Sequence, residues 1–192
     1  MALKVRDAAG ATQNLPEWVD ATYRAAGTIT AAQAAGTGKD LLLFTASSTG
    51  VTRLCKAKFT LQGGGTESAA LNTFVMLRVV AAPTGQTNVA ITATKHDNND
   101  GNPGSTVNIT PSTTQTAGTS STVLGASALG IGIGGTGGTS YLTEVVEFAC
   151  GPESMQKAIV VPASGFVTWR TVGALPSGSQ LAFDIMWTEA AE

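Results

Sequence analysis

The chain has 192 residues, of which 12% are charged, and a formal net charge of −2 with one histidine and two cysteines. This charge balance provides no basic surface for nucleic acid, so we expect no nucleic-acid partner. No run approaches the ~18 apolar residues of a membrane-spanning helix, so we expect no membrane partner. The length fits one domain that can bury a core without a metal or a disulfide, and we expect no cofactor.

Residues 1–35 are predicted to form an N-terminal arm and linker. Residues 4–15 indicate a small hairpin or extended pair, and residues 16–23 either one helical turn or an extended arm. Residues 25–38 contain Ala, Gly, Thr and Gln without an apolar face, which is typical of a linker. The first seven residues lack the apolar core of a signal peptide, so we expect synthesis in the cytoplasm.

Residues 36–192 are predicted to form one β-domain, because short apolar runs alternate there with turns rich in Gly and Pro. The last run places Leu181, Phe183, Ile185 and Trp187 on one face, with the period of two of a half-buried strand. The one helix candidate, 66–72, is about two turns long. The predicted strands are 40–46, 51–61, 73–81, 87–95, 106–110, 141–149, 157–161, 166–172 and 180–188.

Short strands with such turns, and without long helices between them, predict an all-β fold: a jelly-roll-type antiparallel β-sandwich with an extended N-terminal arm. The predicted core consists of the large apolar residues of these strands. They are Phe59, Phe74, Leu77, Val89, Ile91, Val146, Phe148, Trp169, Phe183, Ile185 and Trp187.

The tract 111–140 differs from the rest because it is mostly Ser, Thr, Gly and Ala. A tract of this length and composition predicts a long mobile loop. Ile131 and Ile133 alternate with glycines, so a slim strand is the alternative interpretation.

Three stretches resemble known motifs, and each lacks part of the motif that it resembles. Residues 132–137 match the letters of a dinucleotide fingerprint, but no helix is predicted after them. Residues 36–39 resemble a phosphate loop, yet Asp40 stands where Ser or Thr is required. The acidic turn at 97–102 resembles a calcium loop but has Asn102 and Asn108 at the EF-hand Gly and Glu positions; a polar turn and a different calcium site both stay open.

The catalytic inventory is thin. A catalytic triad would have to use His96, and no nucleophile elbow surrounds a serine. Paired carboxylates are the remaining possibility, with Glu144, Glu147, Glu153 and Asp184 near predicted strands. Glu144 and Glu147 are three residues apart, so on a strand they face opposite ways. We therefore predict that the protein is not an enzyme and that it holds no catalytic, cofactor or metal site.

The two cysteines leave two interpretations open. Cys55 shares a face with apolar residues of its predicted strand and fits a small buried side chain. A disulfide between Cys55 and Cys150 is the alternative, although without a signal peptide two thiols are expected.

The opening segment carries a resemblance. Residues 5–15, Val-Arg-Asp-Ala-Ala-Gly-Ala-Thr-Gln-Asn-Leu, are similar to the phrase V-[RK]-D-x-x-G-x-x-Q-x-L that begins many tailed-bacteriophage structural proteins. The Thr/Ala/Gly-rich body, with its apolar strand at 73–79 and its last strand pair, resembles jelly-roll capsid decoration (cement) proteins. The resemblance implies a non-enzymatic virion protein at the capsid surface that binds the major capsid protein and itself, as a dimer or trimer.

The arm is too short to bury its own apolar side chains, so these are predicted to form a partner surface. They are Leu15, Trp18, Val19 and Tyr23. Strand addition to a partner's sheet edge is the expected mode, and folding back on the sandwich is the alternative. Two other functions stay open. One is a phage tail, fibre or spike component that binds a receptor, and the other is a carbohydrate-binding module.

Overall fold

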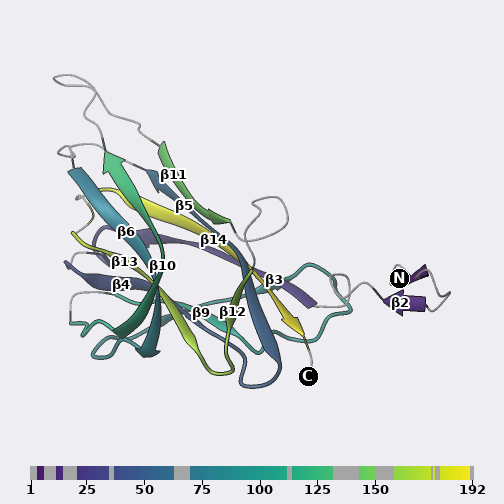
Figure 1. Ribbon diagram of the computed structural model, residues 1–192. Helices are drawn as coiled ribbons and strands as arrows, with labels where there is room; N and C mark the ends of the chain where they lie inside the picture. Colours follow the sequence, from purple (N-terminus) through teal and green to yellow (C-terminus); the bar gives the residue numbers. More distant parts are fainter. Residues whose placement is uncertain are drawn as a thin grey trace.

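A computed structural model shows an antiparallel β-sandwich (Figure 1). Two six-stranded sheets face each other, and the described residues form no helix. This confirms the predicted all-β sandwich. The structure describes residues 4–6, 12–14, 21–34, 37–62, 70–111, 114–131, 143–149, 158–173, 175 and 178–190.

We name each sheet after one of its long strands. The β6 sheet has the order β10-β6-β13-β4-β9-β7 and the β5 sheet the order β11-β5-β14-β3-β8, with β12 pairing along β5 as well. The strands of the β6 sheet are β10 (Thr119–Ile131), β6 (Ala70–Ala81), β13 (Phe166–Thr171), β4 (Lys39–Thr45), β9 (Thr106–Ile109) and β7 (Val89–Ile91). Those of the β5 sheet are β11 (Thr143–Ala149), β5 (Val51–Gln62), β14 (Gln180–Ala190), β3 (Ala21–Thr30), β8 (Thr94–Lys95) and β12 (Ile159–Val161).

The two last strands of the chain are central in the two sheets. β13 pairs with both β4 and β6, and β14 pairs with both β3 and β5. Consecutive strands often lie in different sheets. The chain crosses between β3 and β4, β4 and β5, β5 and β6, β7 and β8, β8 and β9, β10 and β11, β12 and β13, and β13 and β14. The C-terminal pair therefore joins two earlier strand pairs into one sandwich.

The core lies between the sheets and is aromatic. The Phe44 ring meets Trp187 edge-on with centroids 5.4 Å apart, and Phe59 meets Phe74 edge-on at 4.7 Å. Trp169 lies 5.7 Å from Phe59, and all five side chains are fully buried. Burying one large apolar side chain stabilises the fold by about 1.5–3 kcal/mol, so this cluster is a main source of stability.

Most of the predicted core is confirmed. Ile91 and Phe148 are partly buried and pack against the core. The prediction that Val89 is buried is wrong. Its side chain is 43% exposed, because β7 is a three-residue strand at the edge of its sheet. The side chain of Val146 lies outside the described residues. The predicted residues found buried are Phe59, Phe74, Leu77, Trp169, Phe183, Ile185 and Trp187.

The predicted linker at 25–38 is wrong over most of its length. Residues 21–30 form β3, which pairs with β14 over ten positions from Gln180↔Thr30 to Glu189↔Ala21. The predicted boundary at residue 36 therefore falls too late, since the sandwich includes β3. One inward position of β3 is a glycine because the Phe183 ring lies over Gly27, where an added Cβ would come within 2.8 Å of it.

The predicted mobile loop at 111–140 is also wrong for residues 119–131. Residues 119–131 form β10, which pairs with β6. The alternative of a glycine-containing strand holds as far as Ile131. An added Cβ at Gly125 would lie 2.7 Å from the Phe148 ring, so the absence of a side chain there allows close packing.

Several smaller expectations have clear outcomes. The N-terminal hairpin is confirmed: β1 (Lys4–Arg6) pairs antiparallel with β2 (Thr12–Asn14). The strand predicted at 87–95 is two strands, β7 and β8, which belong to different sheets. The helix candidate at 66–72 is wrong at its end, since β6 begins at Ala70.

Candidate functional site

The structure places one member of the predicted partner set inside the sandwich. Tyr23 lies in β3 and is 2% exposed, with its ring centroid 5.8 Å from that of Trp187. Its hydroxyl donates a hydrogen bond to the carbonyl of Gly101 at 3.1 Å. Burial raises the pKa of this phenol, and the carboxylates of Glu189 and Asp100 raise it further. Tyr23 is therefore a core residue and not a contact for a partner.

The other three partner candidates, Leu15, Trp18 and Val19, lie outside the described residues. The hairpin that precedes them is described. Among the described strands, β1 and β2 pair only with each other, and neither joins a sheet of the sandwich. Figure 1 shows this hairpin standing apart from the sandwich, so its strand edges are open to a partner.

The carboxylates considered for catalysis have structural partners. Asp184 accepts two hydrogen bonds from the Arg24 guanidinium, at 2.6 and 2.9 Å, and they raise the pKa of Arg24. Glu147 lies 3.3 Å from the Lys56 amine on the neighbouring strand β5. The side chain of Glu144 and all of Glu153 lie outside the described residues. No two of these acids form a described pair suited to glycoside chemistry.

The calcium-like turn at 97–102 docks against β3. The Asp97 carboxylate accepts a hydrogen bond from the amide of Asn99 at 2.9 Å, and the Asp100 carboxylate accepts one from the amide of Thr22 at 3.3 Å. The amide of His96 donates to the carbonyl of Thr22 at 2.9 Å. These contacts are those of a structural turn, and the described residues contain no cluster of three acidic, histidine or cysteine side chains.

Glu189 anchors the rest of this loop to the last strand. Its carboxylate accepts hydrogen bonds from the amides of Gly104 and Ser105 and from the indole N–H of Trp187, at 2.9, 2.9 and 2.8 Å. Burial raises the pKa of Glu189, but the hydrogen bonds from Ser105, Gly104 and Trp187 outweigh it and hold the pKa below its ordinary value. The loop thus closes one end of the sandwich over Trp187.

A second polar cluster, which the sequence analysis missed, fixes the segment 114–118 to the β6 sheet. Asp40 is fully buried and forms an ion pair with Arg170 at 2.8 Å. Its carboxylate also accepts a hydrogen bond from the amide of Gly118 at 2.7 Å, while Arg170 donates to the carbonyl of Gly118 at 2.8 Å. Gln115 completes the cluster through two 2.8 Å hydrogen bonds to the backbone of Asp40.

Part of the outer face of the β6 sheet, by which we mean the face turned away from the β5 sheet, is also buried. Trp169 belongs to the core, so alternation places Arg170 and Thr168 on the outer face. Leu43 and Leu77 share that face, because both stand in register with Thr168. Thr168, Leu43 and Leu77 are each 5% exposed or less, so other parts of the protein cover this region of the outer face.

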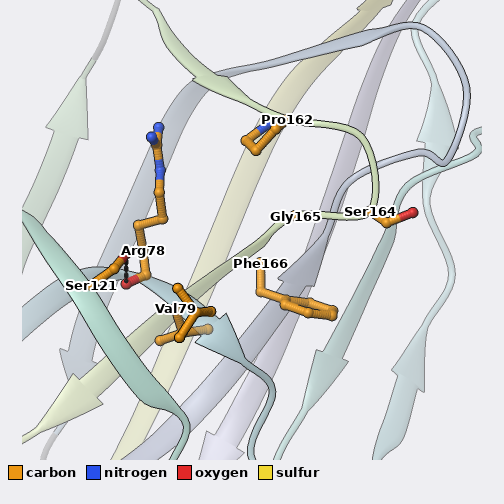
Figure 2. A pocket seen from close by; sticks show the side chains of 8 residues that line it. Arg78, Val79, Ser121, Pro162, Ser164, Gly165 and Phe166 are labelled. Carbon is orange, nitrogen blue, oxygen red and sulfur yellow. Dashed lines mark hydrogen bonds between the residues drawn. The ribbon is translucent and has the colours of Figure 1, made fainter.

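The described surface has a shallow hollow of about 270 Å³ (Figure 2). It is lined by Arg78, Ser121, Pro162 and Phe166 with neighbouring residues, and Arg78 donates a hydrogen bond to the carbonyl of Val160 at 2.8 Å. Ligand sites usually enclose about 300–1,000 Å³ and converge several polar groups, so this hollow is small for one.

The remaining motifs give no site. Lys39 of the phosphate-loop-like stretch donates to the carbonyl of Gln115 and so belongs to the polar cluster. Residues 132–137 lie outside the described residues, and so does Cys150 of the possible disulfide. Cys55 is partly buried, and its thiol donates to the carbonyl of Arg53 at 3.5 Å.

Comparison with known proteins identifies no relative: no protein-family model, no curated protein and no solved structure matches the chain. Among the described residues, no helix has the length and apolar character to cross a membrane. The most distinct surface feature of the described residues is the hairpin of β1 and β2, whose strands pair with no described strand of the sandwich.

Proposed function

We propose that the protein is a non-enzymatic structural protein of a tailed-phage virion, a capsid decoration protein that binds and stabilises the major capsid shell. One observation carries the proposal. The segment that resembles the start of phage structural proteins, residues 5–15, includes the hairpin strands that pair with no part of the sandwich. A body that folds without this hairpin leaves it available to a neighbouring protein.

The size of the hairpin supports a role in binding. Each of its strands has three residues, and an isolated two-stranded hairpin is at best marginally stable in water. Each strand also keeps one edge without a partner strand. Addition to the sheet edge of a capsid subunit would satisfy these backbone groups and stabilise the hairpin, which is the physical basis of recognition by strand addition.

The engagement of the acidic side chains supports a role without catalysis. Asp184, Glu147 and Glu189 are each held by a cation or by backbone and indole donors within the protein. Groups held in this way stabilise loops and sheets, and they are not free to bind and protonate a substrate.

The two other functional classes receive less support. Sugar binding normally uses exposed aromatic rings, but Trp169 and Trp187 are fully buried and Tyr23 is nearly so. A tail or fibre component would use the same sandwich. We rank it second because the phage-like segment is a hairpin outside the body, which suits attachment to a shell.

A binding assay with purified components tests the proposal. Shells of the phage whose genome encodes the chain, assembled without this protein, are sedimented with the full chain and with a variant lacking residues 2–14. We expect the full chain to sediment with the shells to a fixed stoichiometry and the shortened variant to stay in the supernatant. If the full chain does not bind, the assignment to the shell is wrong; if both bind equally, the hairpin is not the attachment element.

A further inference from the structure

The four outer edges of the two sheets differ in how they are protected. β7 and β8 have three and two residues, too short to template another chain. The outer edge of β5 is covered by β11 together with β12, which has three residues and is equally short. β11 carries Glu144 and Glu147, of which Glu147 pairs with Lys56. Proteins commonly use short length and charge to prevent edge strands from pairing with other chains. Three of the four edges are therefore protected.

β10 is the exception. It has thirteen residues, Thr-Ser-Ser-Thr-Val-Leu-Gly-Ala-Ser-Ala-Leu-Gly-Ile, without a charge or a proline, and it ends the β6 sheet. Irregular pairing is confined to its first half. From Gly125 to Ile131 it stays in unbroken register with β6, and among the described strands none pairs with its other edge, so the backbone groups on that edge are open to a further strand.

The outer surface of β10 is also apolar. A shift of register between Val123 and Gly125 places Val123 opposite Leu77 and Ala126 opposite Val75, two residues on the same face of β6. Both side chains consequently point to the outer face, and Val123 is 63% exposed. Leu124, between them, packs against the core instead.

We propose that β10 pairs with β10 of a second copy of this chain, antiparallel about a twofold axis, to join the two β6 sheets into one continuous sheet. The charge pattern selects this occupant. In an antiparallel twofold contact the residues beside the axis come close to their own copies, so a charge there would be repelled by the same charge of the second copy. β10 has no charged residue. If β11 paired with β11 of a second copy instead, Glu147 would approach the second Glu147. The inference rests on the sheet geometry and not on the proposed function.

Charge variants of the full chain test the pairing. The first variant carries Val123→Lys and Ala126→Lys, which together place four positive charges at the contact of two copies. The second variant carries Val123→Glu and Ala126→Glu, which place four negative charges there. Both side chains are exposed in one copy of the chain, so we expect both variants to keep the circular dichroism and the cooperative unfolding of the unchanged protein. Their unfolding temperature should be lower, because they lack the stabilisation that a second copy provides. If either double variant unfolds, the single changes A126K and A126E replace them.

Sedimentation equilibrium over a dilution series gives the readout. We expect the unchanged chain to have twice the 19.4 kDa of one copy, each variant alone to fall to one copy, and an equimolar mixture of the Lys and Glu variants to return to two. A monomeric unchanged chain, a dimer that persists in both variants, or a mixture that stays monomeric would each overturn the proposal. Isolated protein suffices, so failure here is distinct from failure to bind shells.

Discussion

Two acidic residues, the fully buried Asp40 and the partly buried Glu189, hold the long connections of this sandwich to its sheets. Asp40 fixes segment 114–118 through Arg170, Gly118 and Gln115, and Glu189 fixes residues 104–105 at the opposite sheet. A buried charge is costly unless it is paired, so each carboxylate stabilises the protein only with its full set of donors. This dependence can be measured by changing acid to amide.

Asp40→Asn should destabilise the protein by about 3–5 kcal/mol, because it leaves the guanidinium of Arg170 without its counter-charge in a buried site. Glu147→Gln makes the same chemical change in an ion pair whose side chains are 35% and 39% exposed, and should cost less than about 1 kcal/mol. Urea unfolding of both variants checks this. Equal losses would mean that the Asp40 cluster does not hold segment 114–118.

Glu189→Gln should reduce stability at pH 7 by about 1–3 kcal/mol, since the neutral amide accepts hydrogen bonds more weakly than the carboxylate. The folded protein lowers the pKa of Glu189, so its contribution is complete above the unfolded value near 4.5 and is lost as the pH falls through the lower folded pKa. Unfolding curves should therefore converge for the two proteins in acid. A constant difference from pH 7 down to pH 3 would contradict the assignment.

Phe183→Ala should cost about 3–5 kcal/mol, because Phe183 is 3% exposed and its ring fills the space over Gly27. Val172→Ala removes apolar atoms at a 59% exposed position and serves as the control, with an expected change within about 0.5 kcal/mol. Thermal and urea unfolding measure both. A loss below about 1 kcal/mol for Phe183→Ala would show that β14 does not present this residue to the core.

The residue pattern predicts the core better than the polar clusters, for a physical reason. Alternation of Leu181, Phe183, Ile185 and Trp187 is local and follows from the period of a strand. Asp40 and Arg170 are 130 residues apart, and the Gln115 that joins them lies in a tract of small polar residues. Their contact depends on which strands become neighbours, and single-sequence spacing does not contain that information.

At the scale of elements, apolar strands are predictable and strands of small residues are not. The run at 180–188 predicts β14 closely, whereas β3 and β10 consist largely of Ala, Gly, Ser and Thr. Tertiary packing determines these two: Phe183 needs Gly27, and Phe148 needs Gly125. The preference of a residue for strands depends more on the side chains packed against it than on the backbone itself. The sequences of β3 and β10 therefore contain no local pattern that predicts a strand.

Two nested deletions separate the arm from the sandwich. Removing residues 2–14 takes away only the hairpin and should leave the unfolding temperature unchanged. Removing residues 2–24 also takes Tyr23, Arg24 and the start of β3, with the ring contact to Trp187 and the ion pair to Asp184, and should strongly destabilise the protein. Differential scanning calorimetry compares them. If the shorter deletion destabilises as much as the longer one, the hairpin packs on the body.

At the scale of the whole molecule, the last two strands complete the sandwich. β13 and β14 lie between earlier strand pairs in both sheets, so most strand neighbours are far apart in sequence. Such topologies fold slowly, because distant segments must meet before contacts compensate for lost chain entropy. The described strands from β3 to β14 then form one sandwich. The N-terminal hairpin and the β10 edge are the surfaces that we assign to other chains.

Our central proposal is that the protein belongs to a tailed phage and decorates its capsid shell. Electron cryo-microscopy of particles of the phage proposed to encode this chain tests it. We expect regular density on the outer surface of the shell into which the sandwich fits, with its N-terminal hairpin directed at a major capsid subunit. Particles grown from a genome lacking the gene should show bare shell at those positions. Density at the tail or fibres instead, or complete absence of the chain from particles, would contradict the account.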